Sequence, residues 1–460
     1  MKTYDLIIIG SGGGAKLRPA SELGKKVAII EKDSPGGTCL NRGCIPSKML
    51  IHAADLAQEL KEFSKHNLTV DTKPHVDWAT LVSRVSNSVS GTSENITKAY
   101  ENNPNVDYYH GEAKFVSNKV ISINGEEITA DKIFIAVGTR PAVPRIPGLA
   151  DTPYLDSTRA LRNTTQPKKM IVIGAGYIST ELGYFYGALG TEVDFVVRSH
   201  FLKNEDKEVA DEFARVFAKK FPLHLGYSPS KVEYANDQFT VTLENAEGEV
   251  KKLEADALFV ATGITSNSDT LALENTDIEV DPKGYIKTDN HLRTTAEGVY
   301  ALGDVIGKYF FRHSVNFEGE YLLRTLYTAP ADEPIKYSPM PHAVFTNPQI
   351  AGVGKTSEQL RAEGIDYIVG RNDYKDSAMG GDALQSDYGF CKLIFDRSSR
   401  KLLGAHILGH EASNMIHMCI AYITMEATLD DMLKTIYIHP ALPEIVRNAA
   451  RKAEKAFKEA

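Results

Sequence analysis

Two cysteines, Cys39 and Cys44, lie five positions apart in the segment 36–48, which reads GGTCLNRGCIPSK. On a helical turn, this spacing brings the two sulfurs close enough to bond if the helix is distorted. The segment leads into a predicted helix, whose N-terminal dipole lowers the pKa of a thiol and favours the thiolate that exchanges disulfides. The spacing therefore predicts a redox-active pair at Cys39 and Cys44.

A metal site is the alternative reading of these cysteines, and the sequence does not favour it. Zinc would need two further ligands at metal-like spacing, which the distant Cys391 and Cys419 do not offer. Four cysteines in 460 residues are also too few for a disulfide scaffold. We therefore expect no metal, and we interpret the close pair as catalytic.

A base for thiol chemistry is available near the C-terminus, in the segment IHPALPE that contains His439 and Glu444. Histidine is the side chain whose ordinary pKa suits taking and returning a proton near neutral pH. Glu444 follows five residues later, close enough across a turn to orient the ring and fix its tautomer. Because most histidines in proteins are structural, this motif alone does not establish a catalytic role for His439. The other motifs in the chain support that role.

A glycine-rich turn, Gly10–Ala15, follows a predicted strand at Tyr4–Ile9 with the spacing GxGxxA. Its glycines, Gly10, Gly12 and Gly14, let the backbone approach a pyrophosphate at a helix N-terminus. Glu31 ends the next predicted strand, where a carboxylate can hold a ribose diol. An ordinary tight turn is the alternative. The preceding strand, the glycine spacing and the acidic residue Glu31 together favour nucleotide binding.

The helix after this turn departs from the usual pattern. Lys16, Leu17 and Arg18 stand where small residues are expected on its inner face. Pro19 should kink or shorten the helix, because proline lacks the backbone donor and clashes with the preceding turn.

A second glycine turn begins at Gly174 and continues through Gly176, again directly after a predicted strand, Lys169–Ile173. The next predicted strand ends at Val197 and is followed by Arg198, so no carboxylate stands where NAD is usually selected. An arginine there can pair with a 2′-phosphate, which favours NADPH over NADH. Lys203 is a candidate second contact, and the alternative is that both cations are solvated surface charges.

These two turns imply two nucleotide-binding domains of the βαβ type, and the fold class is therefore α/β. Helices are predicted at Met49–Phe63 and Thr80–Tyr100, and short strands within Val106–Thr129. Strands and helices after Pro341 predict a C-terminal α+β domain. The expected domains are 1–150 and 268–338 for the first nucleotide, 151–267 for the second, and 339–460 for dimerisation.

Charge and hydropathy exclude other classes of function. The 52 basic and 60 acidic residues are mixed along the chain and give a net charge of −8, so no basic face is available for nucleic acid. No apolar stretch approaches the roughly 18 residues that a membrane span needs, and the N-terminus has no export signal. We expect a cytoplasmic protein with small-molecule partners.

The segment 36–48 resembles the active-site signature of the class I pyridine nucleotide–disulfide oxidoreductases, the family of lipoamide dehydrogenase, glutathione reductase, mycothione reductase and mercuric reductase. The resemblance runs essentially end to end, because the second glycine turn, Ala301–Asp304 and His439–Pro440 follow in family order. It implies FAD, a nicotinamide cofactor and a homodimer.

The resemblance also implies roles for individual residues. Cys39 would be the thiol that attacks the substrate, and Cys44 the thiol beside the flavin. Lys48 would pair with Glu181 near the nicotinamide, although an isolated lysine could equally be a surface residue. His439 would reach the disulfide of the other subunit. The remaining implied cofactor contacts are Glu31 with the FAD ribose, Ala113 with the adenine edge and Asp304 with the ribityl chain. Thr38, Gly138 and Gly263 are expected to be further cofactor-binding residues.

The substrate is less clearly indicated. Tyr437 stands where lipoamide dehydrogenases usually carry a second histidine, and the C-terminus ARKAEKAFKEA lacks the cysteine pair of mercuric reductases and large thioredoxin reductases. The motifs favour an NADPH-dependent reductase of a low-molecular-weight disulfide, similar to mycothione reductase. The alternatives are a dihydrolipoyl dehydrogenase that uses NAD and a non-catalytic, flavin-binding regulatory protein. The segment Gly263–Asn267, at the end of the expected second domain, departs from the family pattern. The sequence therefore does not predict how the chain leaves that domain.

Overall fold

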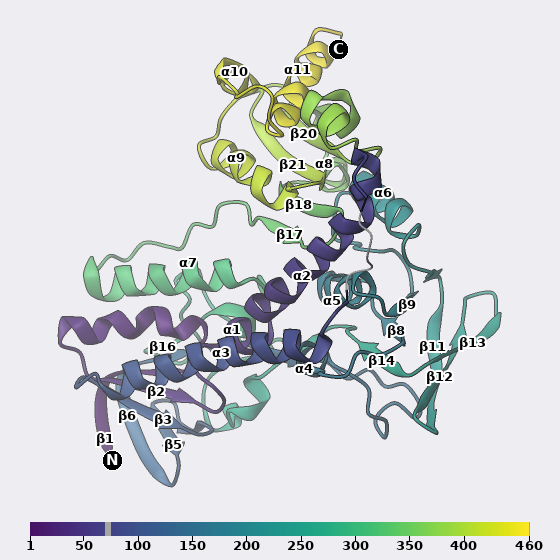
Figure 1. Ribbon diagram of the computed structural model, residues 1–460. Helices are drawn as coiled ribbons and strands as arrows, with labels where there is room; N and C mark the ends of the chain where they lie inside the picture. The colour runs from purple at the N-terminus through teal and green to yellow at the C-terminus, as the bar shows by residue number, and fades with distance from the viewer. Residues whose placement is uncertain (70–74, 460) are drawn as a thin grey trace.

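The computed structural model describes residues 1–69 and 75–459 (Figure 1). A seven-stranded sheet forms the centre of the first domain, in the order β3-β2-β1-β6-β5-β4, with β16 also paired to β6. Its strands are β1 (Lys2–Ile9), β2 (Val27–Glu31), β3 (Val106–His110), β4 (Lys114–Ser117), β5 (Val120–Ile123), β6 (Glu126–Ile135) and β16 (Val299–Ala301). The pairs β1–β2, β1–β6, β2–β3 and β16–β6 are parallel, as the βαβ pattern predicts.

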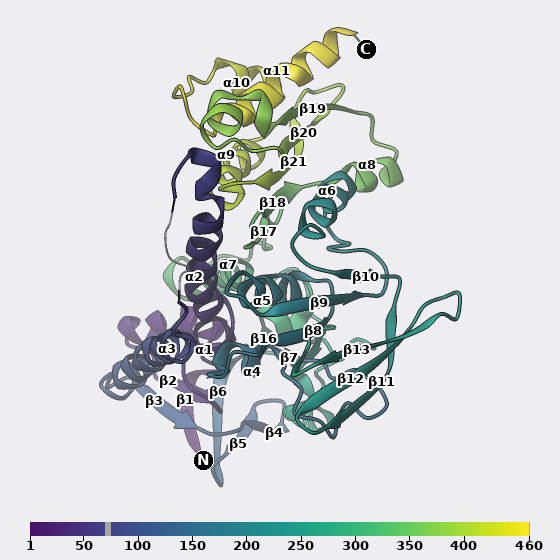
Figure 2. The same ribbon diagram turned by 45° about the vertical axis from the view of Figure 1, so that its right-hand side comes forward.

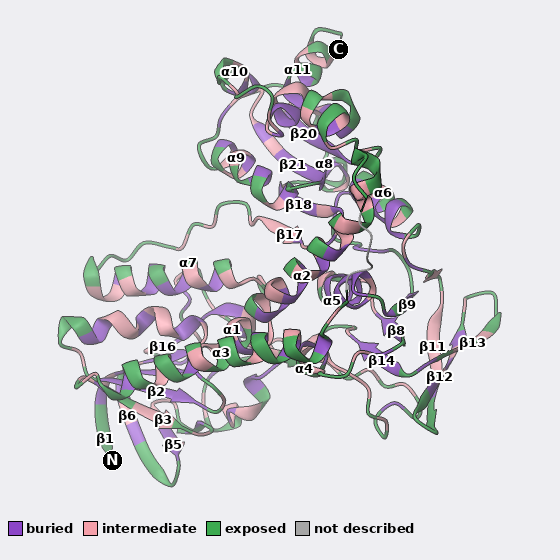
Figure 3. Ribbon diagram, viewed as in Figure 1, coloured by how far each residue is buried: buried purple, intermediate pink, exposed green. Residues whose placement is uncertain are grey.

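Both faces of this sheet are covered, because alternate side chains of β1 enter two separate cores. Ile7 and Ile9 pack with residues of the segment 271–305, whereas Leu6 and Ile8 pack against the helical side. That side is formed by η1 (Gly13–Leu23), α3 (Trp78–Glu101) and α7 (Arg312–Leu323). Figure 3 shows the contrast between buried strands and helices that keep an exposed side.

The helix after the first glycine turn is a 3-10 helix, η1, which contains Pro19 and runs from Gly13 to Leu23. The disturbance expected at Pro19 therefore takes the form of a tighter helix. Lys16 and Arg18 point outward, where Lys16 pairs with Glu320 at 2.6 Å and Arg18 with Glu22 at 3.0 Å. Leu17 is fully buried and supplies the inner face.

The second domain contains a parallel sheet in the order β10-β9-β8-β14. The strands are β8 (Lys169–Ile173), β9 (Glu192–Val197), β10 (Leu223–Leu225) and β14 (Ala257–Val260), and the helices are α4 (Ser157–Arg162), α5 (Tyr177–Ala188) and α6 (Lys207–Phe217). A three-stranded antiparallel sheet that the sequence analysis missed lies beside it, formed by β11 (Ser228–Ala235), β12 (Gln238–Glu244) and β13 (Val250–Ala255).

A two-stranded ribbon marks the passage between the two domains, where β7 (Thr139–Pro141) pairs with β15 (Ile264–Ser266). Arg140 donates from β7 to Ser266 O at 2.9 Å and also bonds Asp269. Asn267 donates to Val137 O at 2.8 Å. The segment Gly263–Asn267 is thus an ordered return to the first domain despite its unusual sequence.

The C-terminal domain is an antiparallel sheet in the order β17-β18-β21-β20-β19, with helices packed on it (Figure 2). Its elements are β17 (His342–Val344), β18 (Gln349–Gly354), β19 (Tyr367–Asp373), β20 (Phe390–Asp396), β21 (Leu402–Gly409), α8 (Ser357–Glu363), α9 (Ala412–Thr424), α10 (Leu429–Lys434) and α11 (Glu444–Glu459). Cys391 and Cys419 are fully buried in its apolar core. None of the described helices is long and apolar enough to cross a membrane.

One long helix, α2 (Cys44–Glu62), links the three domains. It starts at the short helix α1 (Gly37–Arg42), packs along α5 of the second domain and extends toward the C-terminal domain in both views (Figures 1 and 2). Leu50 and Ile51 of α2 belong to the same apolar core as Val344 of β17 and Phe390 of β20. The helix that carries the cysteine pair is therefore fixed against all parts of the fold.

Candidate functional site

The cysteine pair spans a break between two helices. Cys39 lies in α1, Cys44 is the first residue of α2, and Gly43 separates them with φ −146°. A Cβ on Gly43 would lie 2.9 Å from the carbonyl oxygen of Thr38. This break is the distorted helix that the spacing predicted, and it places two half-buried thiols side by side.

The two thiols divide their protons unequally. A hydrogen bond from Cys44, together with the positive charges of Arg312 and Lys48, lowers the pKa of Cys39 to about 7 against the opposing effect of burial. The shared hydrogen bond, burial and the neighbouring Cys39 raise the pKa of Cys44 above its ordinary value. The sequence analysis expected a helix dipole to favour a thiolate, and in the structure the favoured thiolate is Cys39, not the helix-starting Cys44.

The first glycine turn touches the cysteine loop. A Cβ on Gly12 would lie 3.4 Å from the Cα of Gly37, and a Cβ on Gly37, whose φ is +69°, would lie 2.6 Å from the Cα of Gly12. The approach requires glycine at position 37, where an added Cβ would collide with the backbone of Gly12 and where φ is positive. The contact sets the start of α1 beside the turn, at the place where the sequence predicts a pyrophosphate.

Glu31 is held at the end of β2 by local donors. Its carboxylate accepts hydrogen bonds from the N–H of Ser11 at 2.9 Å, from the Ser11 hydroxyl at 2.8 Å and from the N–H of Asp33 at 3.0 Å. The carboxylate also lines the cavity described next. Its position suits the predicted contact with a ribose diol.

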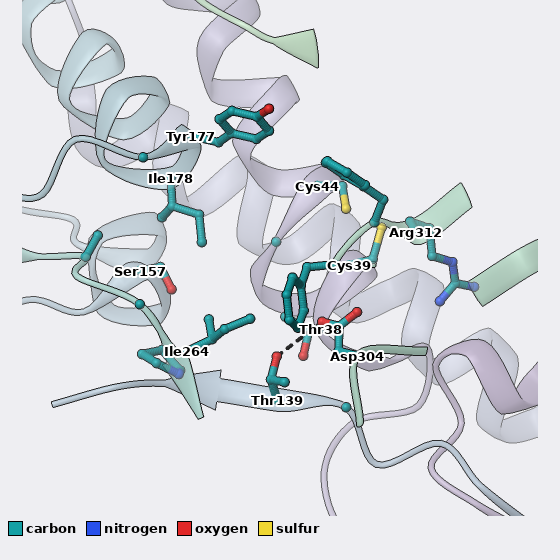
Figure 4. A pocket seen from close by; sticks show the side chains of 18 of the residues that line it. Thr38, Cys39, Cys44, Thr139, Ser157, Tyr177, Ile178, Ile264, Asp304 and Arg312 are labelled. Carbon is teal, nitrogen blue, oxygen red and sulfur yellow. Dashed lines mark hydrogen bonds between the residues drawn. The ribbon is translucent and has the colours of Figure 1, made fainter. Parts of the chain in front are cut away.

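A single cavity of about 2410 Å³ joins both glycine turns to the cysteine pair (Figure 4). It is lined by almost every residue that the sequence predicted to contact a cofactor or to react within one chain: Gly10, Gly12, Glu31, Thr38, Cys39, Cys44, Lys48, Ala113, Gly138, Gly174, Gly176, Glu181, Arg198, Gly263 and Asp304. The two predicted nucleotide sites and the two thiols thus share one cavity.

Gly14 differs from the other predicted cofactor contacts of the first turn. It does not line the cavity, and a Cβ added to it would lie 2.5 Å from Cγ2 of Ile8. Gly14 therefore permits close packing of η1 on the sheet, which is the usual role of the third position in such a turn.

Lys48 and Glu181 form an ion pair at 2.6 Å between α2 and α5. Burial raises the pKa of Glu181 above its ordinary value, while the charge of Lys48 and a hydrogen bond from the N–H of Phe345 oppose the rise. The Lys48 ammonium also lies 4.5 Å from the centre of the Phe345 ring. The sequence-predicted pair is thus present, and Phe345 of the C-terminal domain supports it.

Asp304 lies at the tip of the return strand, facing the cavity near Thr38 (Figure 4). Burial raises the pKa of Asp304 above its usual range, and the hydroxyl of Thr139, which donates a 3.1 Å hydrogen bond, opposes the rise. The sequence analysis singled out Gly138 but missed Thr139, for which the adjacent glycine was the only available signal.

The second glycine turn leaves room for a ligand. A Cβ added to Gly176 would meet nothing within 4 Å. Arg198 and Lys203 are exposed, line the cavity beyond this turn and have no carboxylate partner within the described residues. Unpaired cations at this position suit a phosphate group.

Tyr177, which follows Gly176 directly, is anchored by residues that the sequence analysis missed. Its hydroxyl donates a 2.5 Å hydrogen bond to the buried carboxylate of Glu205, which also contacts Nε2 of His342 at 2.8 Å. The Tyr177 side chain lines the cavity opposite Cys44 (Figure 4). No sequence spacing links these three residues, because they come from three separate segments.

His439 and Glu444 form the expected contact, with Nδ1 of His439 3.1 Å from the Glu444 carboxylate. Burial tends to raise the pKa of Glu444. Hydrogen bonds from the N–H of Ala441 and from His439, together with the charge of Arg447, outweigh this effect and hold the pKa below its ordinary value. The His439 side chain is 71% exposed and does not line the cavity of its own chain. Orienting Nδ1 leaves Nε2 free to exchange a proton outside this chain.

Within residues 1–69 and 75–459, no three histidine, cysteine, aspartate or glutamate side chains gather as a metal site would require.

Comparisons with known proteins show to which family the chain belongs. Residues 4–326 match the family described as pyridine nucleotide-disulphide oxidoreductase. The chain belongs to this family. Residues 340–450 match its dimerisation domain, which coincides with the C-terminal sheet and helices.

Relatives within the pyridine nucleotide-disulphide oxidoreductases cover the whole chain. A mycothione reductase of Mycobacterium tuberculosis is 34% identical over 464 residues, covering 98% of this chain and 99% of the relative. A mitochondrial dihydrolipoyl dehydrogenase 1 of Arabidopsis thaliana is also 34% identical, over 97% of this chain and 89% of its own. The Cu(II) complex of the HOCl-induced flavoprotein disulfide reductase RclA from Escherichia coli superposes with a TM-score of 0.87 at 27% identity, covering 98% and 99% of the two chains.

Membership in this family identifies the chain as an FAD-dependent oxidoreductase that acts on a sulfur group with NAD(P) as partner. The described residues fit these cofactors, because the Gly12–Gly37 contact, the open Gly176 and the carboxylates of Glu31 and Asp304 all face one cavity. The relatives are reductases and dehydrogenases, which speaks against the non-catalytic alternative.

Proposed function

We propose that this chain forms a homodimer that reduces a low-molecular-weight disulfide with NADPH, in the manner of the mycothione reductase that it resembles over its full length. The observation that carries the proposal is the cavity that runs from the exposed Arg198, beyond the second glycine turn, to the thiols of Cys39 and Cys44. One continuous path thus connects a phosphate-binding end to a redox-active end.

The cofactors are assigned to the two glycine turns. FAD, when bound, would supply the chemistry that links hydride transfer from the nicotinamide to two-electron reduction of the Cys39–Cys44 disulfide. Glu31 holds the ribose, Asp304 with Thr139 holds the ribityl chain, and Lys48 supplies positive charge that its pairing with Glu181 orients. Arg198 and Lys203 bind the 2′-phosphate of NADPH.

The exchange steps follow from the unequal pKa values of the thiols. The Cys39 thiolate attacks one sulfur of the substrate, breaking its disulfide and forming a mixed disulfide with Cys39. The released thiolate takes a proton from His439 of the partner subunit. His439, now deprotonated, takes the proton of Cys44, and Cys44 attacks the sulfur of Cys39. The bond between Cys39 and the substrate sulfur breaks, the Cys39–Cys44 disulfide re-forms, and His439 returns the proton to the second thiolate as it leaves. Two electrons and two protons are transferred in all.

The homodimer is required because His439 lies outside the cavity of its own chain. The segment that carries it has two strongly exposed isoleucines, Ile436 at 97% and Ile438 at 80%. Apolar side chains so exposed beside a catalytic motif are typical of a surface that a second subunit covers. The match of residues 340–450 to a dimerisation domain supports the same assembly.

Dihydrolipoyl dehydrogenase activity with NAD is the competing function. The dihydrolipoyl dehydrogenase of Arabidopsis thaliana is 34% identical to this chain, the same identity as for the mycothione reductase. Two features count against it: Tyr437 precedes His439 where a second histidine is usual, and Arg198 favours a phosphorylated nicotinamide. Steady-state rates with NADPH and NADH against a panel of low-molecular-weight disulfides, and with NAD and dihydrolipoamide, separate the two. We expect a large preference for NADPH over NADH. Among the disulfides of the panel, we expect one to be reduced at a clearly higher rate than the others. A large preference for NAD with dihydrolipoamide would overturn the proposal.

A further inference from the structure

Half of the eight lysine and arginine side chains that line the cavity of the described residues are paired with a carboxylate. The pairs are Lys32–Glu112, Arg42–Asp33, Lys48–Glu181 and Arg140–Asp269. Four cavity cations have no carboxylate partner among the described residues: Arg198, Lys203, Lys308 and Arg312. Arg198 and Lys203 lie at the second glycine turn, and Lys308 lies over the ring of Tyr337 at 3.9 Å. Arg312 is the one for which no role has been assigned.

Arg312 lies at the junction of the first glycine turn and the cysteine loop. Its Nη1 is 3.8 Å from the position of a Cβ on Gly12, the residue that touches Gly37. Figure 4 shows the side chain leaving α7 beside Cys39 and extending away from the sulfur. Arg312 is the first residue of α7, which is packed tightly on η1, since a Cβ on Gly13 would lie 2.0 Å from Cγ2 of Val315. The guanidinium is therefore held at this junction by the fold.

The first glycine turn and the helix that follows it offer little positive charge for binding a pyrophosphate. The pyrophosphate of a dinucleotide binds at such a turn with the help of the following helix dipole. Here the following helix is a 3-10 helix containing Pro19, whose hydrogen-bond geometry is poorer than that of an α-helix. Its cations, Lys16 and Arg18, are paired outward with glutamates. A pyrophosphate with two negative charges would therefore meet no unpaired side-chain cation from this helix.

We propose that Arg312 is a ligand of the FAD pyrophosphate and supplies the positive charge that η1 lacks. A guanidinium is suited to this task, because its planar donors match phosphate oxygens and its charge persists at all working pH values. Cys39 is the other group near Arg312, but no hydrogen bond joins the two among the described side chains, and Arg312 is only a secondary cause of the lowered Cys39 pKa. The phosphate role therefore explains the position of the guanidinium better than the thiolate role does.

The test uses purified holoenzyme in four forms: wild type, Arg312→Met, Arg312→Lys and the matched control Lys308→Met. The control removes another cavity cation that lacks a carboxylate partner among the described residues. The first measurement is the release of FAD, followed by flavin fluorescence after dilution at several KCl concentrations. We expect Arg312→Met to retain FAD about 10- to 100-fold less tightly, as for loss of a hydrogen bond to a charged group, and to show a weaker dependence on salt. Lys308→Met should behave as wild type.

The second measurement is the ³¹P NMR spectrum of the bound FAD. The two pyrophosphate resonances should shift in Arg312→Met and shift less in Arg312→Lys, which keeps the charge, while Lys308→Met leaves them unchanged. This signature is independent of turnover and remains measurable with Arg312→Lys if the methionine variant fails to retain FAD or to fold. Unchanged resonances and FAD release in both Arg312 variants would overturn the proposal, as would a change confined to the pH dependence of Cys39 alkylation.

Discussion

Lys48 and Glu181 are 133 residues apart in the sequence, yet they form a 2.6 Å ion pair that joins the cysteine-bearing helix α2 to the helix of the second glycine turn. The pair lies in the wall of the cavity between the two nucleotide sites. It therefore couples the position of the thiols to the position of the nicotinamide-binding turn. Its removal should affect both folding and electron transfer.

Replacing Lys48 by methionine leaves the buried Glu181 without its cation. Because Lys48 is 35% exposed and the pair is partly screened, we expect a loss of about 1–2 kcal/mol in the free energy of unfolding by urea. Reduction of bound FAD by NADPH should slow about tenfold or more, since a positive charge beside the reacting groups is lost. The double variant Lys48→Met/Glu181→Gln should recover the stability but not the rate. Recovery of both would show that the pair is only structural.

The pKa of Cys39 predicts how the reduced enzyme reacts with alkylating agents. With NADPH present, the rate of iodoacetamide alkylation should rise through a midpoint near pH 7, because the thiolate is the reactive form and forms above the pKa. Peptide mapping should locate the label on Cys39 rather than Cys44. In Cys44→Ala, the main hydrogen bond that lowers the pKa is absent, so the midpoint should move upward. Alkylation of Cys44 in preference to Cys39 would contradict the assignment.

The sequence predicted those features that depend on short-range patterns. The strands at Lys169–Ile173 and Glu192–Val197 have the predicted bounds, because continuous apolar runs bounded by glycine or charge are typical of buried parallel strands. The cavity-lining glycines and the cysteine pair were predicted because their motifs encode local geometry. The third turn position, Gly14, packs on Ile8 and does not line the cavity, a difference that the sequence does not reveal, because a glycine that faces a ligand and one that packs on a strand look alike.

Features that depend on the tertiary arrangement could not be predicted in this way. The β11–β13 sheet was missed although β12 alternates clearly, because the flanking strands β11 and β13 bury only Val232 and Ala255, respectively, and give a weak pattern. Arg312, Thr139 and Phe345 carry no motif of their own. Each reaches the site only because a distant segment folds back onto the first glycine turn or onto α2.

The unpaired cations at the second glycine turn predict the choice of nicotinamide. In Arg198→Ala/Lys203→Ala, the KM for NADPH should rise about tenfold or more, whereas the KM for NADH should change less than about twofold, because only the former carries the 2′-phosphate. Steady-state kinetics with both cofactors measures this. Lys207→Ala is the matched control, since Lys207 is an exposed cation of the same domain that pairs with Asp211 and does not line the cavity. Equal effects on NADPH and NADH would make the two cations ordinary surface charges.

Sharing of the active site between subunits predicts complementation between two inactive variants. Cys39→Ser lacks the attacking thiol and His439→Gln lacks the acid–base group, so each homodimer should reduce substrate at a small fraction of the wild-type rate. A mixed dimer contains one site in which Cys39 of one chain meets His439 of the other. After subunit exchange of equal amounts, half of the dimers are mixed and each has one complete site, so activity should return to about a quarter of the wild-type level. If both residues acted within one chain, every site in the mixture would remain defective, and the absence of recovery in verified mixed dimers would exclude a shared site.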